Sequence, residues 1–170
     1  MPKLIRDKAL VNDNWTLIKE ARDSSILAAL PPGINLIVPL KMWKNYREEL
    51  DNHAGRVGIW LDSDQFVGDI AADTSEEIMQ LPLIALNFPL FSDGRSYTNA
   101  RELRQRGYQG EIRAIGDVLR DQLFYMSRCG FTAFSLRHDQ DPDACLDAFN
   151  DFHTGYQASI DQPLPLYRRR

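Results

Sequence analysis

The sequence predicts a single-domain α/β protein in which about five mainly parallel strands alternate with helices. Short apolar runs of strand length recur at 34–38, 57–61, 83–88, 112–115 and 131–136. Segments with helical spacing separate them, which is typical of βα units and of a parallel sheet with helices outside. Five units are too few for a complete eight-unit barrel. The sheet is therefore expected to be either half-barrel-like or open and doubly wound.

Prolines and glycines mark the boundaries of these units. Pro31, Pro32 and Gly33 come before the first strand, and Pro39 and Pro89 follow the first and third strands. Helical spacing and capping residues predict helices over 41–53, from Thr74 or Ser75 to Gln80, from Ser96 or Thr98 to Arg106, over 118–129 after an Asp117 cap, and from Pro142 after an Asp141 cap.

The two ends of the chain are predicted to lie outside the βα units, which occupy residues 34–155. Within residues 1–30, apolar pieces at 4–6 and 15–18 flank a polar turn at 11–14, which predicts a small N-terminal hairpin. Residues 156–170 contain two prolines and three terminal arginines, so we expect an extended tail.

An exposed sheet edge and the tail together predict a homodimer. A sheet of about five strands leaves edges uncovered unless the hairpin, helices or another subunit cover them. Leu164, Leu166 and Tyr167 form an apolar strip in the tail. This strip is suited to docking on a neighbouring subunit, with packing on its own chain as the alternative.

Composition places the protein among ordinary globular proteins. The 170 residues are 44% hydrophobic and 26% charged, enough for an apolar core without disulfide or metal support. A net charge of −4 argues against a general nucleic-acid binder. The start of the chain lacks the apolar core of a signal peptide, and no run approaches the ~18 apolar residues of a membrane span. We therefore expect a cytoplasmic protein with no membrane partner.

No cofactor or metal motif is present in the sequence. Fifteen residues separate Cys129 from Cys145, without a CxxC pattern, and we expect both to be buried, reduced thiols. The three histidines show no HExxH spacing, and the glycines form neither GxGxxG nor a phosphate-binding loop. The sequence thus predicts no metal site and no intrinsic cofactor.

The loops after the third, fourth and fifth strands carry the candidate site. In parallel α/β proteins, functional residues gather beyond the carboxyl ends of the strands. Glycine allows close backbone approach there, and arginine binds carboxylate, sulfate, sulfite or phosphate. The candidate anion-binding residues are Asp93, Gly94, Arg95, Arg113, Gly116, Arg120 and Arg137.

Asp117 and His138 are the candidates for a catalytic role. The unperturbed pKa of histidine lies near neutrality, which suits proton transfer. However, no nucleophile pattern or carboxylate spacing specifies such a reaction. The alternative is that Asp93 and Asp117 cap helices and pair with Arg95, Arg113 or Arg120, as a purely structural network.

The same stretch resembles a known family. The residues that carry the resemblance are Asp93-Gly94-Arg95-Ser96-Tyr97, then Gly107-Tyr108-x-Gly110-Glu111-Ile112-Arg113-Ala114-x-Gly116-Asp117-Val118-Leu119-Arg120-Asp121-Gln122-Leu123, and Arg128-Cys129-Gly130-Phe131. They resemble the bacterial domain-of-unknown-function family nine-three-four. The likeness extends from Ile5-Arg6-Asp7 nearly to the C-terminus. The chain departs from the family pattern at Ser96, where glycine is usual, and at Thr98, where serine is usual.

The resemblance implies a small cytoplasmic bacterial protein encoded with the sulfite (or nitrite/sulfite) reductase haemoprotein of sulfate assimilation, and often labelled a probable oxidoreductase. We therefore expect an accessory or electron-delivery partner of that haemoprotein. The alternative is a small enzyme acting on an anionic sulfur or phosphorylated metabolite at the strand ends, with Asp117 or His138 moving protons.

Overall fold

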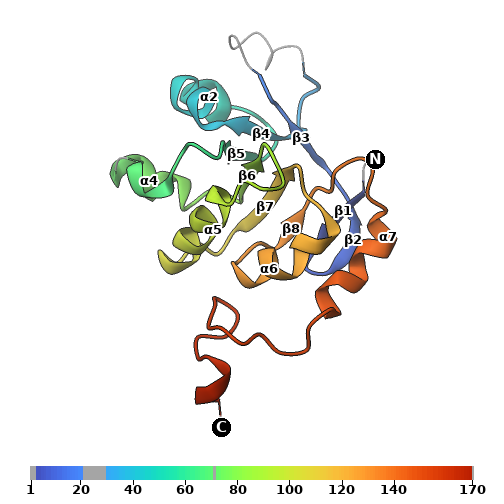
Figure 1. Ribbon diagram of the computed structural model, residues 1–170. Coiled ribbons are helices and arrows are strands. Elements are labelled where there is room, and N and C mark those ends of the chain that lie inside the picture. The colour runs from blue at the N-terminus through green and yellow to red at the C-terminus, as the bar shows by residue number, and fades with distance from the viewer. Residues whose placement is uncertain (1–2, 21–29, 71, 170) are drawn as a thin grey trace.

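The computed structural model describes residues 3–20, 30–70 and 72–169, and this part of the chain forms one α/β domain around a single sheet (Figure 1). The sheet has eight strands in the order β2-β1-β8-β7-β6-β5-β4-β3. The predicted fold class is confirmed. The strand count is higher than predicted because three short strands come from the N-terminal region.

The five predicted strands form the centre of the sheet. They are β4 (Asn35–Pro39), β5 (Val57–Leu61), β6 (Leu83–Phe88), β7 (Glu111–Gly116) and β8 (Ala133–Phe134). All pair in parallel with their sequence neighbours. β8 is much shorter than the predicted 131–136, because only two of its residues pair with β7.

The predicted N-terminal hairpin exists, but its turn was placed wrongly. β1 (Lys3–Arg6) pairs with β2 (Ala9–Asn12), so Val11 lies in a strand instead of a turn. The reversal is at Asp7 and Lys8, both with positive φ (50° and 63°), as a tight hairpin requires. This register places Leu4 opposite Val11 and Ile5 opposite Leu10. Apolar pairing across the strands therefore decides the turn position.

The third N-terminal strand joins the opposite edge of the sheet. β3 (Trp15–Leu17) is parallel to β4, whereas β1 is antiparallel to β8. Only two residues separate β2 from β3 along the chain. A flat sheet would hold these edges about 34 Å apart, but three peptide steps span only about 11 Å. The sheet must therefore curl into a half-barrel whose open side is crossed by residues 9–17 (Figure 1).

Helices follow most of the central strands. They are α2 (Leu40–Asn45), α3 (Arg47–Asp51), α4 (Ala72–Ile78), α5 (Arg95–Gln105), α6 (Leu123–Arg128) and α7 (Pro142–Cys145), with 3-10 turns η1 (Val67–Asp69), η2 (Arg120–Gln122), η3 (Leu146–Asn150) and η4 (Leu166–Arg168). The helix predicted over 41–53 is broken at Tyr46, whose backbone leaves the helical region at φ −126° and ψ 44°.

Several predicted helix starts need correction. α5 begins after Gly94, and Ser96 lies inside the helix, where its hydroxyl donates to the Asn87 carbonyl at 2.6 Å. Asp117 does not cap the helix over 118–129. That segment instead has η2 before α6, because the Asp117 carboxylate is engaged elsewhere. The Asp141 cap is confirmed, since its carboxylate accepts from the Asp143 amide at 3.1 Å.

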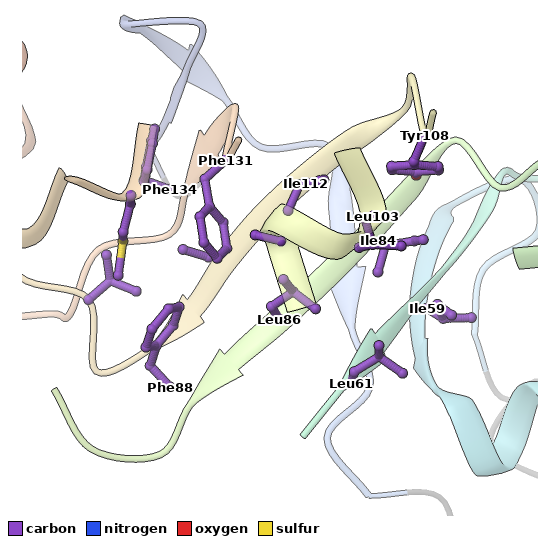
Figure 2. Packing of buried hydrophobic residues seen from close by; sticks show 14 of the residues in the cluster. Ile59, Leu61, Ile84, Leu86, Phe88, Leu103, Tyr108, Ile112, Phe131 and Phe134 are labelled. Carbon is purple, nitrogen blue, oxygen red and sulfur yellow. The ribbon is translucent and has the colours of Figure 1, made fainter. Parts of the chain in front are cut away.

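The main core lies between the outer face of the sheet and the helices. Figure 2 shows alternate residues of β5, β6 and β7 in this core together with Leu103 of α5 and Phe131; they are Ile59, Leu61, Ile84, Leu86, Phe88 and Ile112. Cys129 and Cys145 are buried and unpaired, as predicted, and burial raises the pKa of both thiols. The inner face holds a smaller cluster of Ile37, Leu83, Ala85 and Ile115, against which Trp15, Leu17 and Trp60 pack.

A buried arginine connects this inner face to the crossing segment. Arg113 of β7 is 2% exposed, and its Nη1 lies 3.0 Å from both carboxylate oxygens of Asp13. Its Nε donates to Glu111 at 2.7 Å. Ala85 and Ala133 lie beside it in register, and their small side chains leave space for the guanidinium. The sequence indicated Arg113 as an anion-binding residue. In the structure it instead pairs with Asp13 and Glu111 inside the half-barrel.

We expect Asp13→Ala to lower the free energy of unfolding by about 2–4 kcal/mol, because it leaves a buried guanidinium with one carboxylate instead of two. Urea denaturation measures this change. Lys3→Ala, which removes the exposed ion pair with Asp143, is the control and is expected to have little effect. A change below about 0.5 kcal/mol for Asp13→Ala would show that the Arg113 pair does not hold the crossing segment.

Candidate functional site

A cavity of about 420 Å³ opens at the carboxyl ends of the central strands. Lining residues come from the ends of β3, β5, β6 and β7 and from the segment after β8. These residues are Leu17 and Lys19 from the end of β3 and beyond, Trp60 of β5, Asn87 of β6, Ile115 and Gly116 of β7, and Ser135, Leu136, Arg137 and His138 after β8. The curled sheet thus places its candidate site where parallel α/β proteins usually carry one.

The wall formed by β5 to β7 is held by specific contacts. The Trp60 indole donates to the Ile18 carbonyl at 2.9 Å, which fixes the ring. The Asn87 amide donates to Asp62 at 2.9 Å. Gly116 has φ +93°, and a Cβ there would lie 2.6 Å from Asn87 Oδ1 and closer still to the Phe88 carbonyl. A side chain at position 116 is therefore excluded, and the backbone itself forms this part of the wall.

Beside the cavity, the loop after β6 exposes two apolar side chains. Leu90 is 63% exposed and Phe91 is 54% exposed. The Phe91 amide donates to Asp117 Oδ2 at 2.8 Å, and Gln122 Nε2 donates to the Phe91 carbonyl at 2.6 Å. The Asp93 amide closes a turn onto the Leu90 carbonyl at 2.9 Å. The loop is therefore held in one conformation although its apolar side chains face solvent.

Arg137 links the cavity to this loop. Its Nη1 donates to Asp117 Oδ1 at 2.8 Å, while Nε and Nη2 bind the two oxygens of Asp139 at 2.7 and 2.8 Å. These hydrogen bonds, with that of the Phe91 amide, lower the pKa of Asp117. Arg137 likewise lowers the pKa of Asp139 to about 2, and both carboxylates raise the pKa of Arg137. Both carboxylates are thus ionised partners of one arginine at neutral pH.

The other predicted arginines are also paired. Arg95 binds both oxygens of Asp93 at 3.0 and 2.6 Å, and this bidentate contact lowers the pKa of Asp93. Arg120 binds both oxygens of Asp151 at 3.0 and 2.9 Å. Together with Arg113 and Arg137, every arginine of the predicted anion set therefore faces a carboxylate of the same chain.

The structure divides the predicted site residues into separate groups. Gly116, Arg137 and His138 line the cavity. Asp93 and Gly94 end the loop after β6, Arg95 begins α5, and Asp117, which follows β7, binds the Phe91 amide of that loop. Arg113 lies inside the half-barrel, and Arg120 pairs with Asp151. These arginines therefore do not surround a common anion.

Sequence reasoning missed Lys19, Trp60, Asn87 and Ser135 among the cavity residues. Trp60 and Asn87 are the penultimate residues of β5 and β6. The alternation of side chains along a strand places both residues on the same face of the sheet. This would have identified them as candidates only if the face that carries the site had been known. Lys19 left no such signal, because its position depends on where β3 joins the sheet.

Two further observations concern metals and membranes. Within residues 3–20, 30–70 and 72–169, no group of three or more His, Cys, Asp or Glu side chains is arranged to hold a metal ion. In the same part of the chain, no helix is long and apolar enough to cross a membrane.

The fold and the cavity define a single-domain α/β half-barrel with a polar cleft at its strand ends. The chain belongs to the family described as bacterial protein of unknown function (DUF934), whose model matches residues 58–167. This match includes the loop after β6 and most of the cavity residues. Comparisons with curated proteins and with solved structures found no match.

We expect the Phe91 amide resonance to report the titration of Asp117. The pKa of Asp117 in the folded protein is lower than its ordinary value of 3.8. The hydrogen bonds of its carboxylate therefore stabilise the fold at pH values above 3.8, and this stabilisation is lost as the pH falls through the lowered pKa. An NMR titration between about pH 5 and pH 2 is expected to show a midpoint below 3.8 at Phe91.

Asp117→Asn is expected to remove this transition, whereas Asp64→Asn, at an exposed position nearby, is expected to leave it in place. A wild-type midpoint at or above 3.8 would contradict the stabilisation of the ionised Asp117 carboxylate by its hydrogen bonds from Arg137 and the Phe91 amide.

Proposed function

We propose that this protein works in the bacterial cytoplasm as an accessory or electron-delivery partner of the assimilatory sulfite (nitrite/sulfite) reductase haemoprotein. The family resemblance supplies the partner. The observation that carries a binding role is the loop after β6, where Leu90 and Phe91 are exposed yet held by Asp117 and Gln122.

Exposed apolar side chains on a fixed loop are suited to protein recognition. Burying a Leu or Phe side chain that was exposed to water stabilises a complex by about 1.5–3 kcal/mol. A loop that is already ordered loses less conformational entropy when it binds, so more of this energy contributes to affinity. Aromatic side chains in particular are enriched among the residues that dominate binding energy. Leu90 and Phe91 meet these conditions.

The charges around the loop indicate what kind of surface would receive it. Asp93, Asp117, Asp121 and Asp139 lie in the segments that hold the loop, and Asp62 and Asp64 act electrostatically on Arg95. Against these six carboxylates stand Arg95, Arg120 and Arg137, so the region has an excess of negative charge. We infer that the partner offers an apolar pocket with a basic rim, because complementary charge guides association.

A direct test is the affinity of the purified protein for the haemoprotein. We expect the double variant Leu90→Ser, Phe91→Ser to weaken binding at least about tenfold, measured by biolayer interferometry. The double variant Phe152→Ser, Tyr156→Ser removes side chains of similar exposure elsewhere, 63% each, and is expected to bind like wild type.

Absence of any association with the wild-type protein, together with normal sulfite-dependent growth of a deletion strain, would refute the accessory role. Equal binding by wild type and the Leu90/Phe91 variant would refute only the assignment of the loop.

The alternative of a small enzyme has less support from the geometry. Such an enzyme would use Asp117 or His138 to move protons and arginines to hold an anionic metabolite. Both oxygens of Asp117 already accept hydrogen bonds, and the predicted arginines are paired with carboxylates in different places. His138 alone of the two proton-transfer candidates lines the cavity.

We also propose that the protein forms a homodimer through its tail. Part of the tail packs on its own chain, since Ser159 Oγ donates to the Arg128 carbonyl at 2.7 Å and Arg128 pairs with Asp161. Beyond this point Leu164, Leu166 and Tyr167 are 49%, 42% and 62% exposed. Contact with a second copy would cover this apolar strip.

Light scattering is expected to give twice the chain mass of 19.5 kDa for the full protein at micromolar concentration. Deletion of residues 163–170 removes the apolar strip and is expected to give the monomer mass. A monomeric full-length protein, or a dimer that survives the deletion, would contradict a tail-supported dimer.

A further inference from the structure

Three polar side chains of the strand-end cavity have no partner among the residues that the structure describes. Across the described ranges of the chain, the side chains of Lys19, Ser135 and His138 make no hydrogen bond or ion pair. By contrast, the neighbouring Arg137 makes three side-chain hydrogen bonds to carboxylates. Lys19, Ser135 and His138 therefore offer free hydrogen-bonding groups to a ligand in this cavity.

The charge of the lining favours an anion. Lys19 and Arg137 contribute positive charge, and His138 can donate from its ring; within the part of the chain that the structure describes, no carboxylate lines the cavity. Asp117 and Asp139 pair with Arg137 and offset its charge, which leaves Lys19 as the unpaired cation of this lining among the described residues. An anionic group near Lys19 and His138 would thus gain charge-assisted hydrogen bonds without displacing a carboxylate of the protein.

The apolar residues that line the cavity indicate the character of the uncharged part of the ligand. Leu17, Ile115 and Leu136 are apolar, and the Trp60 ring is held in place by its hydrogen bond to the Ile18 carbonyl. The absence of a side chain at Gly116 keeps the wall next to Asn87 open. A volume of about 420 Å³ is within the range of small-molecule sites in proteins. These features fit an anion with a compact apolar group better than a bare inorganic ion.

We propose that this cavity binds a small organic anion, with its charged group between Lys19 and His138 and its apolar body against Trp60. Ser135 provides a further hydroxyl for the charged group. This site uses residues different from the arginine set that the sequence indicated, and it does not depend on the proposed reductase partner.

The experiment uses benzoate and benzenesulfonate as anionic probes and benzamide as a neutral probe of similar shape. Binding is followed by NMR from the Trp60 indole N–H and the amides of Gly116 and Ser135. For ligands of this size we expect Kd values of about 1–10 mM for the anions. Benzamide is expected to bind at least about fivefold more weakly, because it cannot use the Lys19 charge.

Variants identify the residues that hold the charge. Lys19→Ala and His138→Gln are each expected to weaken the better anionic probe at least about fivefold. Lys44→Ala removes another exposed lysine, on α2 and outside the cavity, and is expected to change nothing. Thermal unfolding of each variant shows whether the fold is retained, and Lys19 and His138 are exposed side chains that can be replaced without opening the core.

Several outcomes would overturn the proposal: no shift at Trp60 with either anion, equal binding of benzamide and the anions, or unchanged binding by both Lys19→Ala and His138→Gln. Reductase affinity of the same two variants separates this proposal from the proposed function. Loss of anion binding with reductase affinity retained is the expected result for two independent sites. Failure of the wild-type protein to bind the reductase leaves the probe results unaffected.

Discussion

The contact of Arg113 with Asp13 and Glu111 is the constraint on which the shape of the domain depends. A guanidinium that is 2% exposed on the inner face of β7 requires carboxylates close to it, because an unpaired buried charge is strongly destabilising. Asp13 is supplied by the segment between β2 and β3, which can reach Arg113 only across the open side of a curled sheet. The same crossing brings β3 beside β4, and hence Leu17 and Lys19 to the strand-end cavity.

At the strand ends, ion pairs within the chain organise two features that share one residue. Arg137 lines the cavity and also holds Asp117, whose other oxygen accepts from the Phe91 amide. The motif that carries the family resemblance therefore has a structural task here: Asp93, Arg95, Gly116, Asp117 and Gln122 all shape the loop that exposes Leu90 and Phe91. The Gly, Asp and Arg residues of this motif thus hold the loop that exposes Leu90 and Phe91. The polar side chains of Lys19, Ser135 and His138 lie in the cavity next to this loop.

The candidate site was predictable in location but not in composition. The rule that sites lie beyond the carboxyl ends of parallel strands pointed to the end of the sheet where the cavity lies, and to Gly116, Arg137 and His138 among its lining residues. It could not distinguish arginines available to a ligand from arginines paired with Asp93, Asp151 or Asp13, because pairing depends on side-chain distances between separate segments. Residues without charge or motif, such as Trp60 and Ser135, gave no functional signal in the sequence.

The sequence by itself determined the α/β class, the five central strands, the Asp141 cap and the burial of both cysteines. These features are encoded within short windows, where apolar runs, prolines and capping side chains act on their near neighbours. Only the tertiary structure decided where residues 3–17 lie and which charges remain free. β1 pairs with β8, which is more than a hundred residues away, and Asp13 meets Arg113 at a separation of 100 residues. Such contacts depend on the whole sheet being folded, and no local pattern specifies them.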